Sequence, residues 1–98
     1  MPMEFYDLLK KSGFSETLLI LGTFEKNEAE HTIFLQKITS TKESNYNAYR
    51  RVRKLLLDHG LIKFKLNESK IKVIYLTEKG KYLLSLLQMI NVILKSES

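Results

Sequence analysis

Two alternating segments near the middle of the chain constrain its fold most strongly. The run LIKFKL, at 61–66, and the run IKVIYL, at 71–76, are rich in β-branched and aromatic residues. The polar residues NESK separate them, at 67–70. Two such runs joined by a short polar connection predict a β-hairpin. A period of two places Lys63 and Lys65 together on one face of the first strand.

An amphipathic segment, SNYNAYRRVRKLLLDHG, comes directly before the hairpin. At 100° per residue, Tyr49, Val52 and Leu56 fall within one arc, which predicts a helix with a core-facing side. Gly60 supplies the stop expected just after the last turn. The opposite side is polar and carries Asn47, Arg50, Arg51 and Lys54.

The residues before this segment predict a helical N-terminal half. The first eleven residues suit a short helix, and Ser15 is a plausible N-cap for a buried helix that ends near Asn27. Residues 28–38 suit a second helix with Phe34, Leu35 and Ile38 facing inward, although residues 32–34 could begin a strand instead. The polar run TSTKES marks a turn before the amphipathic segment.

The last part of the chain predicts a long helix with a surplus of apolar residues. Thr77 caps it, and it could run for about 19 residues, over 77–96. Its apolar content exceeds what one helix face needs against a small core, so we expect a second copy of the chain to cover the rest. The expected dimerisation residues are Leu83, Leu86, Leu87, Ile90, Ile93 and Leu94. Folding back onto the chain's own core is the alternative.

The positive charge of the chain is concentrated in its middle. The 98 residues carry a formal net charge of +5. Residues 41–81 contain eleven Lys or Arg and four acids, a net of +7, which leaves −2 for the remainder. A basic centre with a slightly acidic remainder indicates an anion-binding surface. The alternative is an ordinary solvated surface that is rich in lysine.

What the chain lacks excludes several classes of protein. It has no Cys, so disulfides, thiol chemistry and thiolate zinc sites are excluded. The two His residues, His31 and His59, are distant and make no recognisable metal motif. No apolar run is long enough to span a bilayer, and the N-terminus lacks the order of a signal peptide. We therefore expect one cytoplasmic domain over 1–98, with no metal and no cofactor.

The predicted order, with a helix-turn-helix followed at once by a hairpin, is the winged-helix arrangement. The segment that ends in DHGLI, at 58–62, resembles the recognition helix of MarR-like regulators and its step into the wing. The segment YLTEKGKYLL, at 75–84, is similar to that family's step from the wing into the closing helix. The last helix also resembles that of small archaeal winged-helix proteins that dimerise through a C-terminal antiparallel coiled coil. The resemblance covers about half the chain, roughly 33–84.

This resemblance implies an α+β fold, mainly α: a winged helix-turn-helix with a two-stranded wing and a C-terminal dimerisation helix. It also implies that the helix beginning near Ser44 enters the major groove of double-stranded DNA. There Asn47 can pair with adenine, and Arg50 or Arg51 with guanine. The DNA-binding residues that we expect are Ser44, Asn45, Tyr46, Asn47, Arg50, Arg51, Arg53, Lys54, Lys65, Lys70 and Lys72.

The basic residues of this set also have a simpler interpretation. The arginines suit a solvated helix face, and lysines on an edge strand deter aggregation. Tyr49 lies on the apolar arc and is expected in the core.

The function favoured by these residues is a homodimeric DNA-binding transcriptional regulator. An architectural DNA-binding protein, with little sequence preference, is the alternative within the same class. A winged-helix module for protein interaction is the alternative from another class. We find no nucleophile–base set and no phosphate-binding glycine loop, so we do not expect an enzyme. Nothing in the residues requires or excludes a small-molecule effector.

Overall fold

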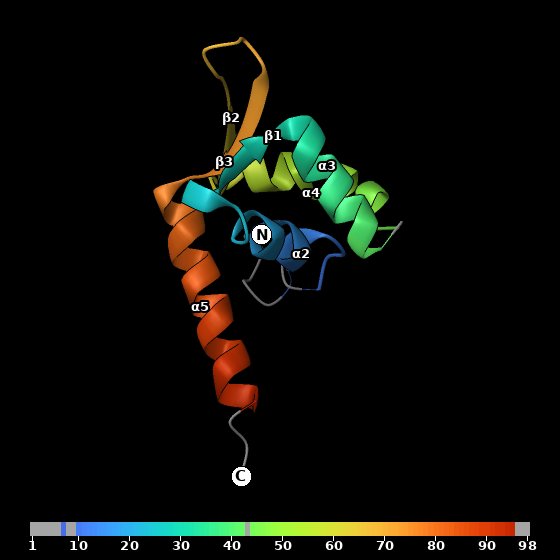
Figure 1. The fold of residues 1–98 in the computed structure, drawn as a ribbon. Coiled ribbons are helices and arrows are strands. Elements are labelled where there is room, and N and C mark those ends of the chain that lie inside the picture. Colours follow the sequence, from blue (N-terminus) through green and yellow to red (C-terminus); the bar gives the residue numbers. More distant parts are fainter. Residues whose placement is uncertain (1–6, 8–9, 43, 96–98) are drawn as a thin grey trace.

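The computed structural model describes residue 7, residues 10–42 and residues 44–95. Within those ranges the chain forms a small α+β fold that is mainly helical, with a three-stranded antiparallel sheet (Figure 1). The short helix expected in residues 1–11 lies largely outside the described residues. In chain order the elements are α2 (Phe14–Leu21), the 3₁₀ turn η1 (Glu25–Asn27), β1 (Glu28–Glu30), α3 (His31–Thr41), α4 (Ser44–Asp58), β2 (Ile62–Leu66), β3 (Lys72–Leu76) and α5 (Glu78–Lys95).

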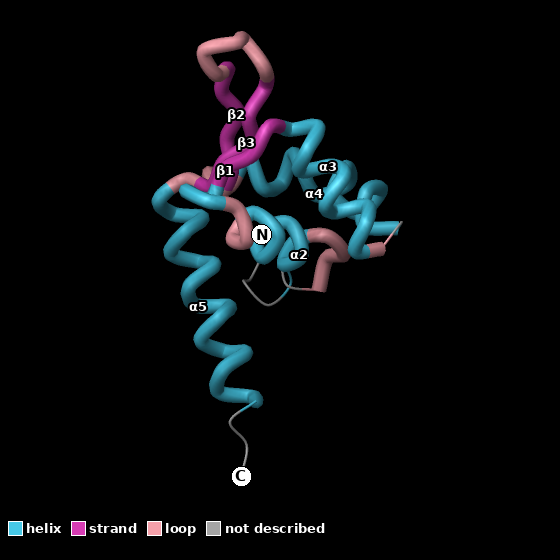
Figure 2. The backbone as a smooth tube through the Cα atoms, in the orientation of Figure 1, coloured by secondary structure: helices cyan, strands magenta, loops and turns pink. Residues whose placement is uncertain are grey.

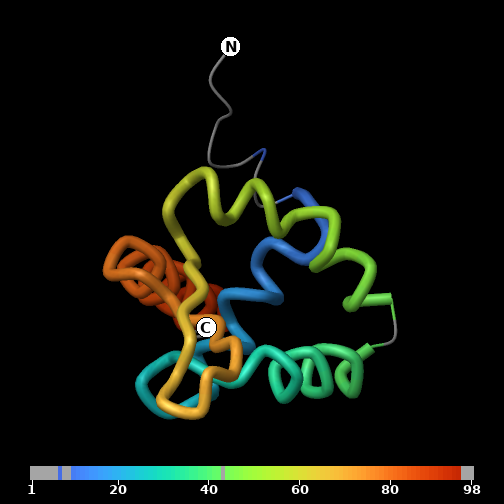
Figure 3. Tube along the Cα trace, turned by 90° about the horizontal axis from the view of Figure 1, so that it is seen from above, coloured from blue at the N-terminus to red at the C-terminus, as the bar shows by residue number. Residues whose placement is uncertain are grey.

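Helix α2 lies at the centre, between α3, α4 and α5 (Figure 3). The predicted central burial is confirmed, since Phe14, Leu18 and Leu21 are fully buried. The predicted cap at Ser15 is wrong. Gly13 is the N-cap, with φ of 91°, and its N–H donates to Glu16 Oε1 over 3.0 Å.

Gly13 is needed because a Cβ there would lie 2.7 Å from the Ala48 carbonyl carbon of α4. The other end of α2 also differs from the prediction. The helix ends at Leu21 and not near Asn27, because Thr23 and Phe24 turn back to donate their N–H groups to Ile20 and Leu21.

Strand β1 was not predicted. Positive φ values at Lys26 and Asn27 redirect the chain, and Glu28–Glu30 then pairs antiparallel with β3. Helix α3 therefore begins at His31, three residues later than expected, and the alternative strand at 32–34 is helical. The predicted inward side is confirmed for Phe34 and Ile38, which are fully buried.

Helix α4 matches its prediction closely. It begins at Ser44, and Tyr49, Val52 and Leu56 are buried. Gly60, with φ of 70°, ends it in a Schellman arrangement, in which the Leu61 N–H donates to Leu56 O over 3.0 Å. This tight stop leads straight into β2.

The predicted hairpin is also confirmed, as the pair β2–β3 (Figure 2). The strand order is β1-β3-β2, and Phe64 lies opposite Ile74 while Lys65 lies opposite Val73. The face with Phe64, Ile74 and Lys72 looks toward the helices, since Ile74 is fully buried. Lys65 lies on the other face. The hairpin tip points away from the body (Figure 1).

Helix α5 begins where Thr77 was predicted to cap it. The Thr77 hydroxyl accepts the Gly80 N–H over 3.0 Å and donates to Gly60 O. Leu84 and Leu87 join the core, and the rest of the helix extends away from the body (Figure 1). Among the described helices, none has the length and apolar character that a bilayer crossing requires.

One contact holds α5 against the start of β2. A Cβ on Gly80 would lie 2.1 Å from Leu61 O, which is closer than atoms can approach. Gly80→Ala should therefore lower the free energy of unfolding by about 1–3 kcal/mol, as overpacking does. At an exposed helix position, the same substitution would instead raise the free energy of unfolding by up to about 1 kcal/mol.

Urea denaturation followed by circular dichroism measures this change. Lys79→Ala, at the exposed neighbouring position, is the control and should stay within about 0.5 kcal/mol of the wild type. Equal or greater stability of Gly80→Ala would contradict the close packing of α5 on Leu61.

Candidate nucleic-acid interface

The basic residues of α4 lie on its solvent side, as predicted. Arg50, Arg51 and Lys54 are exposed, and Arg53 is half-buried. The Arg50 guanidinium lies 5.8 Å from the centre of the Tyr46 ring, a cation–π distance. Among the described residues, no carboxylate forms an ion pair with Arg50 or Arg51.

Lys54 is the member of this set that already has an acidic partner. Its Nζ lies 2.8 Å from Asp58 Oδ2, one helical turn further on. Both side chains are well exposed, so the pair is weak and competes poorly with a phosphate.

The first turn of α4 lies beside the N-terminus of α2. Ser44, Asn47 and Tyr46 are exposed, and Asn45 is half-buried. Asn45, Ser44 and Arg51 line a polar depression with Ser12 and Gly13. Tyr46 faces the other way and lines an apolar depression with residues of α3, among them Leu35 and Thr39. The structure therefore divides the predicted early residues of α4 between two sides of the helix.

The three predicted hairpin lysines do not form one group. Lys65 lies on the face away from the helices, where it pairs with Glu28 Oε1 at 3.0 Å and stacks over Tyr75 at 5.0 Å. Lys72 lies on the helix-facing side, with Nζ 4.2 Å from the centre of the Phe64 ring. Lys70 is in the turn, with φ of 61°. Of the three, Lys65 is the one whose charge is compensated by an acidic partner.

An aromatic cluster joins α3, α4 and the hairpin under the basic side of α4. His31 Nε2 lies 2.9 Å from the Tyr49 hydroxyl, and its ring contacts Phe64 edge-on at 5.4 Å. Phe34 and Tyr49 meet edge-to-face at 5.0 Å. The prediction that Tyr49 is a core residue is confirmed, since it is fully buried.

Burial and charge shift the pKa of two groups in this cluster. Burial raises the pKa of Tyr49 to about 12, with the charge of Arg53 opposing the rise. Burial, together with the positive charges of Lys72 and Arg53, lowers the pKa of His31 below its ordinary value of 6.5. His31 is therefore neutral at pH 7 and links α3 to α4 by its bond to Tyr49.

Sequence reasoning missed the partner of His31. The two residues of the His31–Tyr49 pair are 18 positions apart, and neither lies in a recognisable motif. Only the packing of α3 across α4 brings them together. The aromatic side chains of Tyr49 and Phe64, each on an apolar face of its element, were the available signal.

The expected dimerisation residues divide between core and surface. Leu87 is buried in the core at 7% exposure, so little of it is left for a partner. Leu83, Leu86, Ile90 and Ile93 line an apolar depression with Met89. Beyond it, Leu94 is 71% exposed. The outer half of α5 thus presents a continuous apolar side to solvent.

Metal-binding side chains do not gather anywhere in the part of the chain that is described, where no group of three or more His, Asp or Glu occurs. Comparison of the chain with protein-family models, curated proteins and solved structures finds no match.

Proposed function

We propose that this chain is a winged-helix DNA-binding protein that acts as a homodimeric transcriptional regulator. In this proposal α3 and α4 are the helix-turn-helix, α4 is the recognition helix and the β2–β3 hairpin is the wing. The observation that carries the proposal is the basic side of α4, which is exposed beside a protruding hairpin. An anion-binding surface built from both elements fits the shape of a DNA duplex better than that of a small ligand.

The geometry of α4 supports entry into the major groove. The helix is 15 residues long and buries Tyr49, Val52 and Leu56 on one side, so its opposite side is free to enter a groove about 12 Å wide. Arg50 and Arg51 lie midway along it, within reach of base edges. An Arg fork reads guanine through two hydrogen bonds, and the exposed Asn47 amide can read adenine. This mixture favours sequence reading over purely architectural binding.

The wing adds contacts of a different kind. Lys70 in its turn and Lys72 on its helix-facing side suit the phosphate backbone next to the major groove. Lys65 adds little, because Glu28 already compensates its charge on the far face. Backbone contacts fix the register of α4 on the duplex without reading sequence.

A second copy of the chain is the partner that suits the outer half of α5. Met89, Ile90 and Ile93 are 58%, 42% and 63% exposed, a costly arrangement for an isolated helix in water. When two copies of the chain are related by a two-fold axis, the apolar sides of their α5 helices pack together and are both buried. That axis would also place two copies of α4 on successive half-sites of DNA.

Arg50→Ala combined with Arg51→Ala should weaken binding to random duplex DNA by at least about tenfold, because each guanidinium meets a phosphate or base edge. The slope of log affinity against log salt should fall by about 2, one for each lost contact. Fluorescence anisotropy over a salt series measures both quantities.

The matched control removes the same charge elsewhere. Lys79→Ala combined with Lys95→Ala, both on α5, should leave the slope nearly unchanged. No binding by the folded wild type at low salt would refute DNA binding, and equal losses in the two double variants would refute a role for α4.

Met89→Glu combined with Ile90→Glu should convert the protein from a dimer to a monomer of 11.5 kDa, because two charges cannot be buried in an apolar helix pair. Sedimentation equilibrium measures the mass. Ser85→Glu with Gln88→Glu adds the same charge at exposed polar positions of α5 and should remain dimeric. A wild type that is monomeric at all accessible concentrations would contradict the proposed dimer.

A further inference from the structure

His31 occupies a junction between three parts of the molecule. It is the first residue of α3 and directly follows β1. Its ring lies 5.9 Å from that of Tyr49 on α4 and 5.4 Å from that of Phe64 on β2, centre to centre. Its Nε2 lies 2.9 Å from the Tyr49 hydroxyl. The imidazole thus sits where the proposed recognition helix and wing approach each other.

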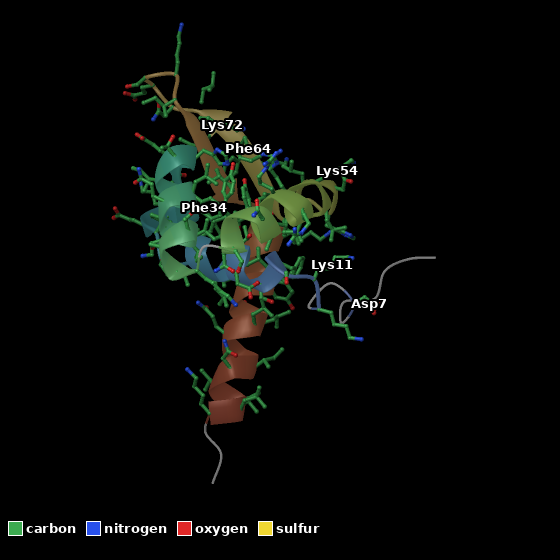
Figure 4. All side chains as sticks on the ribbon, turned by 90° about the vertical axis from the view of Figure 1, so that its right-hand side faces the viewer. Asp7, Lys11, Phe34, Lys54, Phe64 and Lys72 are labelled. Atoms are coloured by element: carbon green, nitrogen blue, oxygen red, sulfur yellow. The ribbon has the colours of Figure 1, made fainter. Side chains whose placement is uncertain are left out.

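Two cations from different elements lie near this junction. Lys72, on β3, places its Nζ 4.2 Å from the centre of the Phe64 ring, against which His31 also packs. Arg53 comes from α4, one turn after Tyr49, and is half-buried. Both charges bear directly on the imidazole, since each lowers the pKa of His31. In Figure 4, Lys72 and Phe64 lie along the hairpin, with Lys72 nearer its tip, and Lys54 lies on α4.

These two cations are not neutralised within the protein. Over the described ranges no carboxylate forms an ion pair with Arg53 or Lys72. Glu28 and Glu30 of β1 pair with Tyr75 and Val73, on the sheet face away from the helices. Among the described residues, the ionisable groups that face His31 are therefore Tyr49 and Arg53 from α4 and Lys72 from β3. An external anion would offset these two uncompensated positive charges.

We propose that Arg53, Lys72 and His31 together form a binding site for a single phosphate of a nucleic-acid backbone. This inference rests on the proposed DNA-binding function. A guanidinium and an ammonium each donate charge-assisted hydrogen bonds to phosphate oxygens. In the proposed complex, their place lies between the groove that α4 enters and the backbone that the wing contacts. Protonation adds a positive charge to His31, and Nδ1–H of the imidazolium is the third donor, since Nε2 is engaged with the Tyr49 hydroxyl.

This site couples DNA binding to the protonation of His31. In the free protein, burial and the two cations hold the pKa of His31 below 6.5. A bound phosphodiester carries one negative charge and opposes those cations, so it raises the pKa of His31 in the complex. Binding then takes up a proton when the pH lies between the two pKa values. By linkage, affinity rises as the pH falls through that window and is constant above and below it.

Proton NMR of the imidazole rings tests the site without any substitution. The pKa of His31 is measured in the free protein and in its complex with a short random duplex. The site predicts a higher pKa of His31 in the complex than in the free protein. An increase of one pKa unit corresponds to about a tenfold gain in affinity across the window.

Four variants, two of them controls, locate the effect. Lys72→Gln should raise the pKa of His31 in the free protein and reduce the change that DNA causes. Lys63→Gln removes the same charge from the opposite, exposed sheet face and should alter neither. His31→Gln should make affinity independent of pH between 5 and 7.5 at constant ionic strength, with His59→Gln as its control.

The outcomes separate this inference from the proposed function. DNA binding with an unchanged or lowered pKa of His31 would overturn the phosphate site and leave DNA binding intact. The same pKa change in Lys72→Gln as in the wild type would also overturn it. Absence of DNA binding by the folded protein would refute the proposed function and this site with it.

Discussion

The contact between Leu61 and the first turn of α5 fixes the geometry on which the rest of the structure depends. Leu61 follows the Gly60 turn that ends α4, and its carbonyl accepts the Thr77 N–H over 3.1 Å. Gly80 packs against the same carbonyl so closely that no side chain fits. The end of α4, the start of β2, the end of β3 and the start of α5 therefore meet at one point. That point sets the angle at which the hairpin leaves the body beside α4.

The same contact explains why local sequence patterns predicted this part of the chain well. The segments at 58–62 and 75–84, on which the resemblance to winged-helix regulators rests, are the two sides of this contact. Amphipathic spacing located α4 and α5, and alternation located the hairpin, because each pattern spans a whole element. Strand β1 has three residues and no such pattern, so only its pairing with β3 defines it. Gly13 became the cap of α2 through its approach to Ala48, a tertiary effect that a search for capping side chains cannot find.

The candidate site shows the same division between local and tertiary information. The exposed arginines of α4 follow from the helical period alone. Which hairpin lysine faces the helices follows from the register of β2 against β3, and this separates Lys72 from Lys65. The bond between His31 and Tyr49 depends on the crossing of α3 and α4. As a result, residues that the sequence grouped together as one basic surface differ in their partners and in the charges around them.

We propose that one surface, formed by α4 and the hairpin, meets DNA while α5 faces another copy of the chain. Backbone amide NMR shifts recorded during titration with a short duplex test it most directly. The account predicts that the largest changes fall in residues 44–54 and 65–72, with α5 nearly unaffected. Changes centred on α5, or none at all in a folded protein at low salt, would contradict it.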